Sequence, residues 1–152
     1  RFNLNLPEKD PQLVRRYCDV IRDLDAADRV LTSSLNGSGL KRIRKAFPDM
    51  ATAFSFGGIV AFYALYRSGF LYFKRTFPGD ALIIHEMIGA SFLANAGLIE
   101  EAKSRGIRVY ILNIMKEDQV KRLFEAGADG FVTNYAALVK RSLPARGKGN
   151  DS

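Results

Sequence analysis

The chain lacks several residue types on which common kinds of site depend. Its 152 residues include no tryptophan, a single cysteine, Cys18, and a single histidine, His85. One cysteine excludes an intramolecular disulfide and leaves no thiolate cluster for zinc. The uncharged run from Met50 to Tyr66 is shorter than the roughly 20 residues that span a bilayer. Because Gly57-Gly58 interrupts this run, it is better suited to a strand, a turn and a helix than to a membrane span.

Length and composition limit how the chain can be organised. A chain of 152 residues with 47% apolar content can form one domain with a core, which we predict over residues 1–143. The segment 144–152 is rich in Gly, Lys and Arg, and we predict that it is a disordered basic tail. The first residue is Arg1 and no secretory signal follows it. We therefore expect a processed or truncated piece of a protein that is cytoplasmic or associated with a membrane.

The net charge of +7 raises the question of an anionic partner. No helix-turn-helix spacing, zinc-finger pattern or basic run interleaved with aromatic residues accompanies the charge, so we expect no nucleic-acid partner. Solvated helix faces explain most of the excess, and anionic substrates or lipid head groups fit it as partners. The basic residues concerned are Arg15, Arg16, Arg22, Lys41, Arg42, Arg44, Lys45, Lys103, Lys121 and Arg122.

Short apolar runs alternate with amphipathic segments along the whole chain. The apolar runs predict strands and the amphipathic segments predict helices, which gives six βα units in strict alternation. The predicted strands cover residues 2–6, 29–34, 51–56, 81–85, 108–113 and 130–134. The predicted helices cover residues 11–25, 38–46, 58–69, 93–105, 116–126 and 135–142.

One short pattern occurs twice near the end of the chain, with a spacing of 21 residues. Gly106 to Asn113 is followed by the similar run Gly127 to Asn134, and each run reads as a helix-ending glycine, a buried strand and a polar residue. This order is typical of parallel α/β proteins. Such proteins carry their ligand site at the carboxyl ends of the strands. Asn113, Thr133 and Asn134 are therefore expected on the functional face.

Six alternating units are compatible with two architectures. An open doubly wound sheet needs a glycine-rich phosphate loop after its first strand, and the segment that begins at Asn5 reads Asn-Leu-Pro-Glu-Lys instead. A (β/α) barrel needs eight units, and two of these are absent. The alternation of strands and helices does not decide between these architectures.

Four ordered segments resemble one known family. Arg1-Phe-Asn-Leu-Asn-Leu-Pro is similar to a family strand that reads Phe-Asn-Ile-Asp/Glu-Leu-Lys, and Arg29 to Asp49 is similar to its Ser-Ser-Phe strand and Leu-x-x-Leu-Arg-x-x-x-Pro helix. Asp80-Ala-Leu-Ile-Ile resembles a later strand. The run Gly106 to Asn134 resembles the final two strands, Gly-x-x-Val-x-x-Trp-Thr-Val-Asn and Gly-Val-Asp-Gly-Ile-Ile-Thr-Asp. The family is that of the glycerophosphodiester phosphodiesterases.

The resemblance implies a TIM-type (β/α) barrel of which this chain holds about six of the eight units. Members of the family hydrolyse a glycerophosphodiester to glycerol phosphate and an alcohol, with two histidines and a divalent cation, Mg or Ca, held by carboxylates. The chain begins at the position of the family's third strand. The family's His-Arg-Gly, Glu-x-Asp and second histidine have no counterpart here.

The resemblance also implies particular site positions. Asn5 stands where the family has an acidic metal ligand, and Pro7 stands where it has a lysine that faces the phosphate. Both replacements remove charge that the reaction uses, although an amide oxygen can still ligate a hard cation. Four residues are expected to form the substrate pocket: Ser34, Tyr110 at the place of the family's tryptophan, Asn113, and Asn134 at the place of its final aspartate.

His85 and Glu86 are the candidates for acid–base chemistry from the residues themselves. They end a predicted strand, where a carboxylate could orient the imidazole, although an isolated histidine in a loop is commonly structural. Ser33 and Ser34 offer hydroxyls at another strand end. Because no Gly-x-Ser-x-Gly elbow surrounds them, capping of the following turn is the favoured role.

Aromatic residues are concentrated between Phe54 and Phe77, around a helix that is apolar on nearly all sides, with Lys74-Arg75 close by. Such a helix must contact something on both faces. One interpretation is a core on one side and an oligomer contact on the other. The second interpretation is insertion at a lipid surface, where aromatic and basic residues act together.

Two functions of different kinds therefore remain open. The chain is either the larger part of a phosphodiesterase, or a catalytically degenerate barrel that binds a phosphate ester, an anionic lipid surface or a protein partner. A barrel with two missing units has open edges. We therefore expect a homo-oligomer, or pairing with the missing N-terminal strands.

Overall fold

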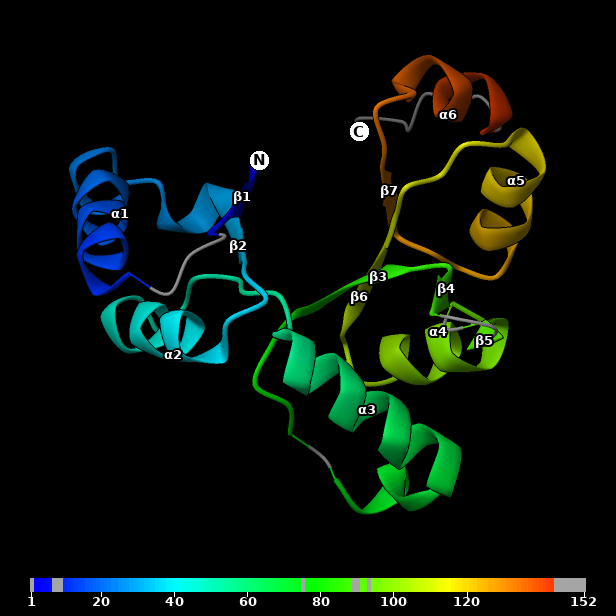
Figure 1. The fold of residues 1–152 in the computed structure, drawn as a ribbon, viewed down its shortest axis with the longest axis horizontal. Helices are drawn as coiled ribbons and strands as arrows, with labels where there is room; N and C mark the ends of the chain where they lie inside the picture. The colour runs from blue at the N-terminus through cyan, green and yellow to red at the C-terminus, as the bar shows by residue number, and fades with distance from the viewer. Residues whose placement is uncertain (1, 7–9, 75, 89–90, 93, 144–152) are drawn as a thin grey trace, which may run out of the picture.

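The computed structural model describes residues 2–6, 10–74, 76–88, 91–92 and 94–143 of the chain. Strands form an arc with the helices on its outer side, and β1 and β7 lie at the two ends of the arc (Figure 1). The first part of the chain comprises β1 (Phe2–Asn5), α1 (Pro11–Asp23), the 3-10 helix η1 (Ala27–Arg29), β2 (Val30–Ser33), α2 (Gly37–Ala46), α3 (Phe56–Ser68) and the 3-10 helix η2 (Phe70–Phe73). The second part comprises β3 (Ala81–His85), β4 (Met87–Ile88), β5 (Ser91–Phe92), α4 (Ala96–Lys103), β6 (Arg108–Leu112), α5 (Glu117–Glu125), β7 (Gly130–Val132) and α6 (Ala136–Ser142).

All strands of the arc run parallel. β1 pairs with β2, and β6 lies between β3 and β7. The segment between these two groups is hydrogen-bonded on both sides: Ala53 N donates to Thr32 O over 2.8 Å, and Phe54 N donates to Ala81 O over 2.9 Å. Isolated parallel bridges join the same segment to β2 and β3. The arc therefore has six strand positions, in the order β1, β2, residues 51–54, β3, β6 and β7.

Most predicted elements are confirmed, with differences at their ends. The third strand, predicted over residues 51–56, is short because Ser55 caps α3 by accepting a hydrogen bond from Gly58 N. The helix predicted over residues 93–105 begins at Ala96 instead, after the Asn95 cap. The antiparallel pair β4–β5, which precedes that cap, was not predicted. Gly106 and Gly127 have φ angles of 72° and 95°, as helix-ending glycines require.

Side chains of the strands alternate between the helix layer and the inside of the arc. Leu82, Ile84, Val109 and Ile111 point outward into the larger of two cores, under α3, α4 and α5. The smaller core lies between β2, α1 and α2, and it includes Val14, Cys18, Ile21, Val30, Ile43 and Met50. The intervening strand residues therefore face inward, where a barrel has its interior.

Two titratable residues of α1, Tyr17 and Cys18, lie at the smaller core, where Tyr17 forms a hydrogen bond to β2. The Tyr17 hydroxyl lies 2.6 Å from the hydroxyl of Thr32, whose side chain is fully buried. Burial raises the pKa of the Tyr17 hydroxyl, and the hydrogen bond to Thr32 opposes that rise. Burial also raises the pKa of the neighbouring Cys18 thiol. Both groups therefore hold their protons more tightly in the folded chain than in the unfolded chain.

We expect the free energy of unfolding to fall as the pH rises past the ordinary pKa values of 9.0 for cysteine and 10.0 for tyrosine. A group whose pKa is raised by folding stabilises the fold below its unfolded pKa, and this contribution disappears as the pH passes the folded pKa. Urea unfolding between neutral and alkaline pH measures the slope. The Tyr17→Phe/Cys18→Ala double variant should start less stable by about 1 kcal/mol or more, because it loses a hydrogen bond, and should show a shallower alkaline slope. If the double variant kept the alkaline slope of the unmodified chain, groups other than Tyr17 and Cys18 would cause the loss of stability at high pH.

Some of the predictions fall on residues outside the described part of the chain. Pro7 and the tail 144–152 lie outside the described residues. The disorder of the tail and the 1–143 domain boundary therefore stay predictions. Within the described part of the chain, every helix is too short or too polar to cross a bilayer.

Candidate functional site

A hollow of about 390 Å³ lies at the carboxyl ends of the strands. Its polar lining comes from Asn3, Asn5, Ser33, Ser34 and His85. The alternation of each strand turns Asn5, Ser33 and His85 toward the inside of the arc, so three separate strands contribute to one surface. This is the face that the sequence indicated as functional.

Asn5 and Ser33 are the last residues of β1 and β2 and pair directly across them. The Ser33 hydroxyl lies 3.4 Å from Asn5 Oδ1, and this contact holds the amide at the edge of the hollow. Both groups are neutral and carry hydrogen-bonding oxygens. They can contact a phosphate or a sugar hydroxyl, although they supply no charge.

Ser34 caps the turn that follows β2, as its sequence context predicted. It is buried, and its Oγ accepts a hydrogen bond of 3.1 Å from Asn36 N in the turn before α2. Asn36 in turn caps α2 through a bond from Ser38 N. Ser34 also lines the hollow, so its capping role is compatible with its predicted place in the substrate pocket.

His85 and Glu86 have different surroundings. His85 is exposed and lies at the carboxyl end of β3, opposite Leu112 of β6. The Glu86 carboxylate forms an ion pair with Arg122 and accepts a 2.6 Å hydrogen bond from the Gln119 side chain, and both partners belong to α5. Glu86 therefore ties the end of β3 to α5 through both of its oxygens. The suggestion from the sequence that Glu86 orients the imidazole stays a prediction, and the contacts that the structure gives to Glu86 are with α5.

The predicted pocket residues do not all gather in this hollow. Tyr110 lies on the inner side of β6, and it lines a second hollow of about 520 Å³ toward the amino ends of the strands. Its ring packs close to Gly130, where an added Cβ would lie only 3.0 Å from Tyr110 Cδ1. Asn3 and Val132 line both hollows, so the two adjoin. Tyr110 is thus separated from Ser34 along the barrel axis.

Asn113 follows β6 and Asn134 follows β7, the last two strands of the arc. Asn113 is exposed in a left-handed conformation with a φ angle of 57°, which asparagine tolerates better than most residues. Its backbone N donates to Val132 O over 2.9 Å. Asn134 is exposed, and the neighbouring Thr133 is fixed by a 2.7 Å bond to Ile114 O. Both amides thus end strands on the functional face, although neither lines the hollow.

Sequence reasoning missed an apolar lip on the same hollow. Leu35 and Phe56 are exposed over 73% and 57% of their surface, and Ile59 lies below them. Phe56 N donates to Leu35 O over 3.3 Å, so two successive strand-to-helix loops form one edge. Large apolar side chains at the ends of two predicted strands, Leu35 just after one and Phe56 as the last residue of the next, were the available signal.

The residues present do not fit a hard divalent cation. Among the described residues no group of three acidic, histidine or cysteine side chains comes together. Asn5 and Ser33 offer neutral oxygens, whereas Mg and Ca sites rely on carboxylates. The Glu86 carboxylate, which follows the nearby His85, is already bound by α5. The prediction that Asn5 is a metal ligand therefore gains no support from its neighbours.

Comparison with known proteins identifies the family. The model of the glycerophosphoryl diester phosphodiesterase family matches residues 3–138. Human lysophospholipase D GDPD3 is 21% identical over 96% of this chain and 52% of its own length, and mouse lysophospholipase D GDPD1 is 20% identical over 93% and 52%. The chain thus spans about half the length of the curated relatives that it matches.

Solved structures agree with this family and establish the fold. A putative glycerophosphodiester phosphodiesterase from Galdieria sulphuraria superposes with a TM-score of 0.68 at 15% identity, over 92% of this chain and 56% of the other. A putative glycerophosphoryl diester phosphodiesterase from Silicibacter pomeroyi gives a TM-score of 0.66 at 19% identity, over 91% and 48%. The predicted incomplete TIM-type barrel is confirmed. The chain belongs to the glycerophosphoryl diester phosphodiesterase family, and it forms six strand positions of that barrel.

Proposed function

We propose that the complete protein hydrolyses a glycerophosphodiester to glycerol phosphate and an alcohol, and that the carboxyl-end hollow of this chain holds part of the substrate. The observation that carries the proposal is one hollow, at the functional end of a barrel of this family, with a polar floor and an apolar lip. The polar floor suits the phosphate and glycerol hydroxyls. The lip of Leu35 and Phe56 suits an alcohol or acyl group of a lysophospholipid, the kind of substrate named for the relatives.

In this proposal each residue has a limited task. Asn5 and Ser33 orient the glycerol phosphate by hydrogen bonds, and Asn113 contacts it from the end of β6, which is the neighbour of the His85 strand β3. Water attacks phosphorus, the bond between phosphorus and the departing alcohol oxygen breaks, and His85 gives that oxygen its proton; the proton that the attacking water loses passes to solvent, from which the exposed imidazole is protonated again. The divalent cation expected for the family would neutralise the phosphate charge, and it needs carboxylates other than those described here.

The alternative proposal is a binding module without chemistry. It is favoured by the neutral donors of the hollow, where the family pattern has an acidic residue in place of Asn5. Either function requires a partner for the open edges. Phe2 and Leu4 of the edge strand β1 are 67% and 39% exposed on the side that faces the helix layer. We propose that two further βα units, or a second copy of the chain, cover them.

Asn113→Gly tests whether the site binds its ligand through this amide. Glycine accepts the φ angle of 57° without strain, so the free energy of unfolding should change by less than about 1 kcal/mol. The affinity for glycerophosphocholine, measured by calorimetric titration, should fall about fivefold with the loss of one hydrogen bond. The matched control is Asp25→Gly, which also replaces a side chain at a positive φ angle, 44°, and which does not line the hollow. An equal affinity of the Asn113→Gly variant and the unmodified protein would remove Asn113 from the site.

A further inference from the structure

The outer surface of α3 and η2 is apolar, and no element among the described residues covers it. Phe56, Val60, Phe70, Tyr72 and Phe73, which we name the aromatic face, are all exposed, and Tyr72 and Phe73 expose 79% and 77% of their surface. The core takes different residues of the same elements, Phe62 and Leu71, which are 1% and 3% exposed. The side chains of the aromatic face are therefore not part of the core.

The exposed rings are assembled into a cluster. The Phe70 and Phe73 ring centroids are 6.1 Å apart, and those of Tyr72 and Phe73 are 5.7 Å apart in an edge-on arrangement. Exposed clusters of large apolar side chains mark interaction sites in folded proteins. Because the rings are already held together, burying them costs little further side-chain entropy.

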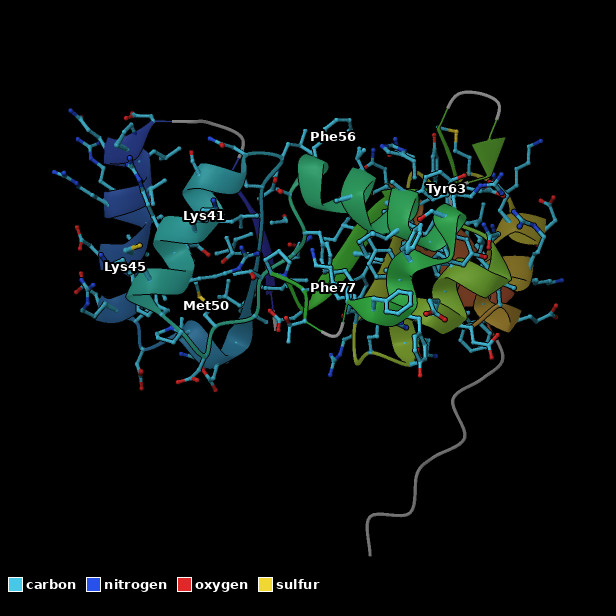
Figure 2. All side chains as sticks on the ribbon, turned by 90° about the horizontal axis from the view of Figure 1, so that it is seen from below. Lys41, Lys45, Met50, Phe56, Tyr63 and Phe77 are labelled. Atoms are coloured by element: carbon cyan, nitrogen blue, oxygen red, sulfur yellow. The ribbon has the colours of Figure 1, made fainter. Side chains whose placement is uncertain are left out.

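Cationic side chains lie beside this cluster and on a neighbouring helix. Arg67 ends α3, and Lys74 follows η2 with its Nζ 5.2 Å from the Phe77 ring centroid. The neighbouring helix α2 exposes Lys41, Arg42 and Lys45, which we name the basic face. Figure 2 shows Lys41 and Lys45 on α2 and Phe56 and Tyr63 on α3, with both helices on the side of the molecule turned toward the viewer. The sequences of α2, α3 and η2 contain no aspartate or glutamate.

We propose that the basic face of α2 and the aromatic face of α3 and η2 dock the protein on an anionic lipid bilayer. Aromatic side chains partition into the boundary between head groups and acyl chains, while lysine and arginine contact the anionic head groups. A symmetric contact with a second copy is disfavoured, because it would bring the same cationic side chains together with no carboxylate from these helices between them. The proposal goes beyond the hydrolytic function and does not depend on it.

Flotation with phosphatidylcholine vesicles that contain phosphatidylserine tests the proposal with the unmodified chain. We expect the chain to float at low ionic strength, to float less at high salt, and not to float with phosphatidylcholine alone. The Phe70→Ser/Tyr72→Ser/Phe73→Ser variant should partition at least about tenfold less. The matched control Val20→Ser/Leu24→Ser/Phe124→Ser removes three other exposed apolar side chains and should float normally. Equal loss in both variants, or no flotation of the unmodified chain, would overturn the proposal.

Charge reversal separates a local basic face from the net charge of the chain. Lys41→Glu/Lys45→Glu and the control Lys121→Glu/Lys140→Glu carry the same net charge, because each replaces two exposed lysines. The first should reduce partitioning about tenfold or more, and the second should reduce it much less. If sedimentation showed a dimer that the aromatic variant dissociates, a second copy would be the occupant, and the bilayer proposal would be wrong.

Because the chain has no tryptophan, a single introduced tryptophan can report whether the aromatic face enters the bilayer. Tyr72→Trp places a single fluorophore in the aromatic face, and Phe124→Trp places one on α5 as a control. We expect brominated lipid in anionic vesicles to quench the tryptophan fluorescence of the Tyr72→Trp variant and to leave that of the Phe124→Trp variant unchanged. Quenching of neither fluorophore, or equal quenching of both, would contradict docking through this face.

Discussion

Phe62→Ala is expected to lower the free energy of unfolding by about 3–5 kcal/mol. Phe62 is 1% exposed, and it packs α3 against Phe54 of the segment 51–54 and against Phe77, which precedes β3. Its ring lies edge-on to Phe54 at 5.9 Å and to Phe77 at 5.1 Å. Truncation to alanine removes both aromatic contacts and leaves a cavity that three elements would have to close together.

Urea unfolding followed by circular dichroism measures this loss. Phe70→Ala is the matched control, because it removes the same side chain from η2, the 3-10 helix that follows α3, where Phe70 is 60% exposed. The control should change the free energy of unfolding by less than about 0.5 kcal/mol. Similar losses in both variants would mean that the buried cluster does not organise the fold and that the assignment of buried and exposed side chains in α3 and η2 is wrong.

His85→Ala is expected to lower kcat for glycerophosphocholine hydrolysis by about 100-fold or more, with little change in KM. An imidazole that protonates the departing alcohol contributes to the transition state and little to the binding of the substrate. His85 is the only histidine of the chain and, among the described residues, the only titratable side chain that lines the carboxyl-end hollow. Steady-state rates of choline release across the pH range measure the effect.

Glu86→Gln is the informative companion variant. Because Glu86 binds Arg122 and Gln119 of α5, its replacement should lower the free energy of unfolding by about 1–3 kcal/mol and leave the pH profile of kcat in place. His85→Ala should change that profile as well as the rate. If Glu86→Gln altered the pH profile as His85→Ala does, the two residues would act as the pair that their sequence suggested. If His85→Ala left kcat unchanged, His85 would have no part in the chemistry.

The fold could be predicted largely because helix-ending glycines and alternating apolar runs are local signals. Gly106 and Gly127 need their left-handed conformations, and each is followed by a strand where the pattern predicted one. The segment after Asp49 was predicted too long, because a single serine at position 55 caps the next helix and ends the strand. The pair β4–β5 has only two residues in each strand, which is too short for a period of two to be recognised.

The site was harder to predict because it depends on height along the barrel axis. Tyr110 and Asn113 are three residues apart, yet Tyr110 faces the hollow at the amino ends and Asn113 lies at the carboxyl ends. The pairing of Glu86 with α5 joins residues 33 or more positions apart, and nothing local to Glu86 indicates it. The lip of Leu35 and Phe56 forms only when two loops meet. Sequence patterns predicted that the carboxyl ends of the strands carry function, and tertiary contacts determine which residues meet there.

Phosphorus NMR of glycerophosphocholine incubated with the protein purified from its native source, in the presence of Mg or Ca, tests the proposed hydrolysis most directly. The phosphodiester and the phosphomonoester give separate resonances, so binding and cleavage are distinguished in one experiment. We predict that the diester resonance is replaced by that of glycerol phosphate. A diester resonance that broadens without being converted would contradict hydrolysis and establish the chain as a binding member of its family.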